Sequence, residues 1–112
     1  MSYVFNEKIE CMPLDEKKEL QSKRLKEVVE RVYNNVPTYR AKMDEIGLKP
    51  EDINSIDDIV KLPFTTKIDL RSNYPFGMFA APMDDIIRLH ASSGTTGKLT
   101  VVGFTKRDID DW

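Results

Sequence analysis

The hydrophobic pattern of this chain changes its period once, near residues 74–77. Before that point apolar residues recur at the spacing of a helix face, and after it they alternate as they do in strands. Only two strand-like runs follow the change, and a two-stranded sheet is marginal on its own. We therefore predict a helical segment over residues 1–75. Residues 76–112 are predicted to be the truncated start of a further domain, so that the chain is either the leading portion of a longer protein or a trimmed piece of one.

The longest predicted helix covers residues 14–34, with charged side chains between the apolar ones. Its apolar face consists of Leu14, Leu25, Val28, Val29, Val32 and Val36. Asn34 and Asn35 then interrupt the pattern, because Asn tolerates the left-handed conformation that often ends a helix. We expect this helix to be the largest element of the helical segment.

Shorter helices are predicted to complete that segment. Pro37 suits the first turn of a second helix, where its missing N–H costs nothing, and Gly47 is a natural stop. The apolar residues of this helix are Tyr39, Met43 and Ile46. Residues 48–75 should form short helical pieces, two of which begin with a capping box at Ser55 and Thr66.

Two β-like runs, residues 86–91 and 99–104, follow the change of period. In the first run, alternation predicts that Ile87, Leu89 and Ala91 point to one face and Ile86, Arg88 and His90 to the other. After the second run a third capping box, at Thr105, opens a helix that the sequence does not complete. The expected fold is therefore mainly helical and is followed by a β-hairpin.

Composition excludes several classes of protein. The 112 residues are 40% hydrophobic and 32% charged with a net charge of −2, which is typical of a globular protein. The charges are spread evenly, so we expect neither nucleic acid nor a membrane as a partner. No apolar run approaches the ~20 residues of a membrane span. Cys11 is the single cysteine, and we expect a reducing, cytoplasmic location.

The connection between the two β-like runs has the chemistry of a phosphate site. It has seven residues and no apolar side chain, namely Ser92, Ser93, Gly94, Thr95, Thr96, Gly97 and Lys98. Its glycines let backbone N–H groups turn inward and bind an anion, the hydroxyls add donors, and Lys98 adds a positive charge. Between Ile86 and Arg107 there are four Lys or Arg and no Asp or Glu. The alternative is a plain Gly/Ser/Thr turn.

Other candidates for chemistry are weaker. The spacing is not that of the P-loop, because only two residues separate Gly94 from Gly97 and a strand follows. His90 is the only histidine, and a packed strand residue is the preferred interpretation. One His and one Cys cannot form a metal site. We assign no catalytic residue and no metal ligand to this chain.

The sequence also resembles a known family. The loop SSGTTGK (92–98) is similar to the phosphate-binding signature of acyl-adenylate-forming enzymes. Further strings resemble the N-terminal portion of the phenylacetate–CoA ligase family, with Leu99 where its pattern has Pro. These strings are YNNVPTYR (33–40), LPFTTKIDLR (62–71), YPFG (74–77) and RLHASSG (88–94).

The resemblance implies an α/β enzyme that joins an arylacetic acid to CoA through an acyl-adenylate. It implies ATP, CoA and Mg²⁺ as cofactors, with the last two held mainly by residues outside this chain, and a homodimer. It gives residues 92–98 the role of binding the ATP phosphates. Two alternatives remain open: a free-standing phosphate- or nucleotide-binding module, and a helical interaction domain without catalysis.

Overall fold

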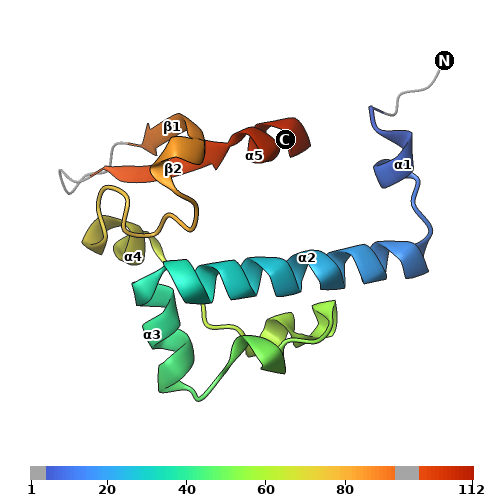
Figure 1. Cartoon of the computed structure of the whole chain (residues 1–112), viewed down its shortest axis with the longest axis horizontal. Coiled ribbons are helices and arrows are strands. Elements are labelled where there is room, and N and C mark those ends of the chain that lie inside the picture. Colours follow the sequence, from blue (N-terminus) through green and yellow to red (C-terminus); the bar gives the residue numbers. More distant parts are fainter. Residues whose placement is uncertain (1–4, 93–98) are drawn as a thin grey trace.

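Helix α2 runs through the middle of the molecule, and the other elements lie on either side of it (Figure 1). The computed structural model describes residues 5–92 and 99–112. In chain order the elements are α1 (Glu7–Glu10), α2 (Leu14–Asn35), α3 (Pro37–Glu45), η1 (Pro50–Asp52), η2 (Ile56–Lys61), α4 (Lys67–Ser72), η3 (Met83–Asp85), β1 (Ile86–Ser92), β2 (Thr100–Thr105) and α5 (Lys106–Asp111). The predicted fold, mainly helical and then a hairpin, is confirmed.

A small apolar core forms where α2 meets α3 and the 3-10 helices η1 and η2. Its buried members are Val29, Tyr33, Val36, Met43, Leu48 and Ile53. The predicted apolar face of α2 is right for Val29 and Val36, but Leu14 is 78% exposed and Val28 46% exposed. The core gathers around the C-terminal half of α2, beyond the reach of Leu14, and Val28 faces a groove on the opposite side. None of the described helices has the length and apolar composition needed to cross a lipid bilayer.

The turn between α2 and α3 differs from the prediction. No non-glycine residue in the described ranges has a positive φ, and Asn34 and Asn35 both belong to α2. The break comes one residue later, at Val36, whose backbone is extended with φ −117° and ψ 95°. The reason is Pro37, because a proline ring disfavours the helical conformation in the residue before it.

Helix α3 also ends earlier than its apolar spacing suggests. Gly47 has a φ of 70° and closes the helix as predicted, since glycine adopts this conformation without strain. The last helical residue is Glu45, so Ile46 leaves the periodic face and is 57% exposed rather than buried. Met43, one turn before, is fully buried.

Aspartate caps recur at the starts of the short helices. In each predicted box the Asp carboxylate accepts a hydrogen bond of 2.8 to 3.2 Å from the backbone N–H three residues earlier. The three pairs are Ser55–Asp58 at η2, Thr66–Asp69 at α4 and Thr105–Asp108 at α5. A fourth pair, Lys49–Asp52 at η1, has the same bond at 2.9 Å but lacks a recognisable capping residue in the sequence. These bonds satisfy N–H groups that a helix leaves unpaired.

The hairpin contains a β-bulge that the alternation rule could not foresee. Strands β1 and β2 are antiparallel, and Ile86 pairs with Thr105 whereas Arg88 pairs with Phe104. Residue Ile87 is therefore an extra residue of β1 with no partner of its own in β2. A bulge of this kind turns the side chains before it to the opposite face from the one that strict alternation predicts. Ile86 consequently points to the face of Leu89, not to that of Arg88 and His90 as predicted.

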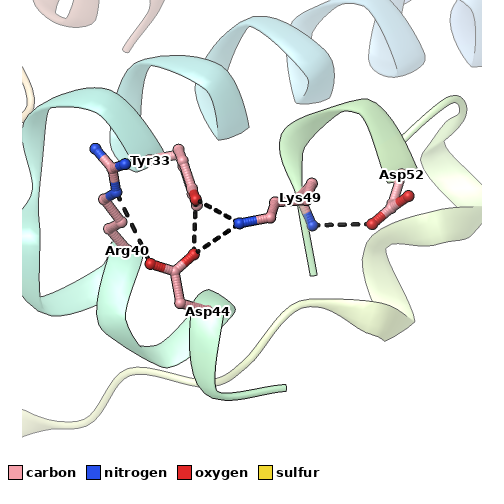
Figure 2. A network of polar contacts seen from close by, with 5 residues as sticks. All are labelled: Tyr33, Arg40, Asp44, Lys49 and Asp52. Atoms are coloured by element: carbon pink, nitrogen blue, oxygen red, sulfur yellow. Dashed lines mark hydrogen bonds and ion pairs between the residues drawn. The ribbon is translucent and has the colours of Figure 1, made fainter. Parts of the chain in front are cut away.

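A polar network covers the edge of the core where α2, α3 and η1 meet (Figure 2). The Tyr33 hydroxyl donates to Asp44 Oδ1 at 2.6 Å, and Lys49 Nζ donates to the Tyr33 oxygen at 3.2 Å. Arg40 lies over the Tyr33 ring, with its Cζ 4.7 Å from the ring centroid. The hydrogen bond from Tyr33 lowers the pKa of Asp44 below its ordinary 3.8, and the charges of Lys49 and Arg40 lower it further.

The Tyr33–Asp44 hydrogen bond predicts a pH effect. Since the folded-state pKa of Asp44 is depressed, its contribution to stability is present above the unfolded value and is lost as the pH falls through the folded pKa. In Tyr33→Phe the donor is gone, so an NMR titration should find a higher pKa for Asp44. Tyr33→Phe should have a lower free energy of unfolding than the wild type at neutral pH. This difference between the two proteins should become smaller as the pH falls below about 4.

Tyr39→Phe is the matched control, because the Tyr39 hydroxyl donates to the backbone oxygen of Pro63 at 2.8 Å and to no carboxylate. It should leave the Asp44 titration unchanged. An Asp44 pKa that is the same in Tyr33→Phe and the wild type would show that the hydroxyl does not stabilise the carboxylate.

Candidate functional site

The predicted phosphate-binding residues begin at the tip of the hairpin. Ser92 is the last residue of β1 and pairs with Thr100, the first residue of β2. The hydroxyls of Ser92 and Thr100 are hydrogen-bonded to each other. The other six predicted residues, Ser93, Gly94, Thr95, Thr96, Gly97 and Lys98, lie outside the described residues. The described part of the site is therefore the hairpin that carries this connection.

One face of the hairpin is held by an aromatic ring packed on a glycine. A Cβ on Gly103 of β2 would lie 2.6 Å from Phe79 Cε2 and 2.7 Å from Phe79 Cζ. The ring of Phe79 thus occupies the space that any larger side chain at position 103 would need. Phe76 packs beside Phe79, with ring centroids 5.3 Å apart. The segment before β1 therefore supports β2 directly.

That segment is in turn tied to the corner between α2 and α3. Asn35 Nδ2 donates to the backbone oxygen of Ala80 at 3.1 Å, next to Phe79. Thr38 Oγ1 donates to Asn73 Oδ1 at 2.7 Å, near the end of α4. Asn73 and Gly77 lie so close that a Cβ on Gly77 would come within 2.7 Å of the Asn73 backbone oxygen. A continuous set of contacts thus links the helical core to the hairpin.

The opposite face of the hairpin carries an aromatic cluster. The ring of His90 lies 4.7 Å from that of Phe104 and 5.9 Å from that of Trp112, and Phe104 and Trp112 are stacked at 5.6 Å. Because Trp112 follows α5, this cluster fixes the last helix to the hairpin. His90 is a packed strand residue, as the sequence interpretation preferred.

Charge on this face favours an anion. Arg88 is exposed, and it shares a face with His90 and Ser92 because residues two apart in a strand point the same way. The sequence from Ile86 to Arg107 contains no carboxylate that would repel a phosphate. Hydroxyls, an arginine and a carboxylate-free hairpin are chemically suited to binding a phosphate.

A groove of about 830 Å³ separates the hairpin from α2. Val28 and Arg31 line it from α2, and Phe79, Val101 and Gly103 line it from the other side. Its charged lining residues are of both signs, and it includes none of the described hydroxyls of the hairpin tip. Within residues 5–92 and 99–112, no group of three or more His, Cys, Asp or Glu side chains is placed to hold a metal ion.

Sequence reasoning missed two residues of this arrangement, Thr100 and Gly103. Gly103 had a usable signal, because an isolated glycine inside a strand pattern often marks the close approach of another group. Thr100 had none, since only the register shows that it lies opposite Ser92. The structure gives Phe79 a packing role beneath β2.

Known proteins with similar sequences share one name. The chain is 54% identical over 104 residues to the phenylacetate–coenzyme A ligase of Escherichia coli K12, and 56% identical over 106 residues to that of Aromatoleum evansii. These matches cover 93% and 95% of the chain and 24% of each relative, so the chain spans about a quarter of the length of the curated relatives it matches. No family model matches the chain.

Solved structures agree with this result. A 2-hydroxyisobutyryl-CoA ligase, solved with 2-HIB-AMP and CoA, superposes with a TM-score of 0.74 at 32% identity and covers 87% of this chain and 22% of its own. A second structure of that ligase has the same TM-score over 96% of this chain, at 26% identity. The fold and the hairpin therefore match one part of this α/β acid–CoA ligase. It belongs to the phenylacetate–CoA ligase family and corresponds to the N-terminal quarter of its members, which confirms the family predicted from sequence.

The contact between Phe79 and Gly103 predicts a specific mutational coupling. Gly103→Ala places a methyl group against the ring, and such overpacking should lower the free energy of unfolding by about 1–3 kcal/mol. In a Phe79→Leu background the tip of the ring is absent, so the same substitution should cost clearly less. Urea unfolding of the four proteins measures both costs. Equal costs in the two backgrounds would mean that the ring does not limit position 103.

Proposed function

We propose that the chain is the N-terminal part of an ATP-dependent aryl-acid–CoA ligase. The complete enzyme would convert phenylacetate, ATP and CoA into phenylacetyl-CoA, AMP and pyrophosphate. The observation that carries this proposal is 47–56% identity, over nearly the whole chain, to four proteins named phenylacetate–coenzyme A ligase from distinct bacteria. Identity at this level across one continuous stretch supports a common reaction as well as a common fold.

The proposed reaction has two steps. The carboxylate of the acid attacks the α-phosphorus of ATP, and the bond to pyrophosphate breaks to give an acyl-adenylate. The thiolate of CoA then attacks the acyl carbon, and AMP leaves. In the first step negative charge develops on the departing pyrophosphate, and donors fixed around the β- and γ-phosphates stabilise it. We assign that task to Ser92, Ser93, Gly94, Thr95, Thr96, Gly97 and Lys98.

The described residues fit a nucleotide phosphate at this position. Ser92 presents a hydroxyl at the hairpin tip, Arg88 adds positive charge on the same face, and the flanking strands carry no carboxylate. The rigid hairpin, packed on Phe79 and on the aromatic cluster, keeps this end of the site in place. A preorganised support of this kind is what electrostatic stabilisation of a transition state requires.

Further features of the proposal concern the rest of the enzyme. Mg²⁺ and CoA would be held mainly by residues that this chain does not contain, so the 112 residues alone should be inactive. We also propose that the chain divides at residue 75 into a helical segment and the start of the α/β domain. The complete enzyme is proposed to be a cytoplasmic homodimer that acts on a small-molecule acid and not on nucleic acid.

The substrate class is tested by acid-dependent turnover of the complete protein. With ATP and CoA present, phenylacetate should support AMP release at a kcat/KM well above that with 2-hydroxyisobutyrate. The sequence relatives are 47–56% identical, whereas the structures of the hydroxyisobutyryl enzyme are 26–32% identical. A preference for the hydroxy acid would overturn the arylacetic assignment, and no acid-dependent AMP release with either would overturn the ligase itself.

The phosphate role predicts a second outcome. In the complete protein, Lys98→Ala and Gly94→Ala should slow adenylation while leaving the fold intact. Loss of one charged phosphate contact should cost on the order of 1.5–3 kcal/mol of transition-state stabilisation. Acid-dependent exchange of pyrophosphate into ATP measures this step without CoA. Lys67→Ala, an exposed lysine at the start of α4, is the matched control and should exchange normally. Unchanged exchange in Lys98→Ala would contradict the assigned role.

A further inference from the structure

The last cross-strand pair of the hairpin joins two hydroxyls, only one of which belongs to the predicted phosphate-binding residues. Ser92 and Thr100 face each other in the β1–β2 register, and their side-chain oxygens are hydrogen-bonded. Thr100 lies outside residues 92–98, and its own sequence neighbours give it no recognisable role. The pair forms the base from which the connection between the strands departs.

We propose that Thr100 is a positioning residue of the phosphate site. Its hydroxyl donates to Ser92 Oγ and thereby directs the Ser92 O–H toward a phosphate oxygen of the nucleotide. This inference rests on the proposed function, since it concerns the same site, and it adds a residue that the sequence motif does not contain.

The direction of this hydrogen-bond chain follows from the number of hydrogens that the two hydroxyls can donate. Each hydroxyl has one hydrogen, so a hydrogen-bonded pair keeps one hydrogen free for a third group. A phosphate oxygen can only accept, and therefore the free hydrogen must point to it. Either oxygen of the pair can be the donor, and we assign the free hydrogen to Ser92 because Ser92 is exposed whereas Thr100 is half-buried. A donor chain of this order also polarises the terminal O–H.

The surroundings favour a ligand as the third group. The sequence between Ile86 and Arg107 contains no Asp or Glu, so no carboxylate of the hairpin itself competes with a ligand for this hydrogen. Arg88 and His90 lie on the same face of the hairpin as Ser92, and Arg88 supplies a positive charge to that face. Thr100 is well suited to hold its partner, because a β-branched side chain in a strand has few accessible rotamers.

The test compares substitutions of Thr100 in the complete protein. Thr100→Val keeps the shape and removes the hydroxyl, whereas Thr100→Ser keeps the hydroxyl. Thr100→Val should lower kcat/KM for ATP about tenfold, the effect expected when one hydrogen bond that serves a charged group is lost. The KM values for the acid and for CoA should not change. Thr100→Ser should keep most of the wild-type kcat/KM for ATP. Thr65 is an exposed threonine before α4, and Thr65→Val should behave as the wild type.

A double substitution separates positioning from a merely structural role. If Thr100 acts through Ser92, then Ser92→Ala should cause a similar loss, and Ser92→Ala combined with Thr100→Val should lose no more than either alone. Additive losses would overturn the proposal. So would a Thr100→Val protein with unchanged kcat/KM for ATP, or one in which all substrates are affected equally together with a lower melting temperature.

Failure of the proposed function is recognised separately. Wild-type protein that forms no acyl-adenylate from an arylacetic acid would refute that function before any variant is made. In that case the dissociation constant for ATP, measured by calorimetry on the same variants, decides the role of Thr100. About tenfold weaker binding in Thr100→Val, with recovery in Thr100→Ser, supports it, and equal affinities or no binding of ATP by the wild type overturn it.

Discussion

The structure depends on the burial of the C-terminal half of α2 against the segment that follows it, residues 37–53. Val29 and Tyr33 pack on Met43, Leu48 and Ile53, and the last two of these come from segments with little regular structure. Around this small core, carboxylates cap the starts of the short helices, and a side chain of α2 holds the backbone at the start of η2. Ser22 Oγ accepts the backbone N–H of Ile56 at 2.9 Å.

From this core a set of polar and packing contacts leads to the hairpin. The corner between α2 and α3 fixes residues 73–80 through Asn35 and Thr38, and Phe79 from that segment packs against Gly103 of β2. The helical segment thereby sets the position of β2, the strand that follows the proposed phosphate-binding residues. Sequence strings without a reactive group, such as residues 33–40 and 74–77, therefore have a structural role. They help to position the hairpin that carries the proposed site.

The sequence predicts local structure well where one residue type has one physical consequence. Pro37 and Gly47 mark the start and the end of α3, and the three predicted aspartate boxes all form. It fails where a tertiary contact or a register decides. The bulge at Ile87 turns Ile86 to the other face, and Val28 faces the groove although its spacing matches the core. The Ser92–Thr100 pair is likewise a product of register, which the loop motif alone does not predict.

The most direct measurement of the central claim is a crystal structure of the complete protein with a non-hydrolysable ATP analogue. The account predicts that the β- and γ-phosphates lie at the tip of the β1–β2 hairpin, with Ser92 Oγ within about 3 Å of a phosphate oxygen and still hydrogen-bonded to Thr100. A triphosphate bound elsewhere, with no contact to residues 92–98, would contradict it.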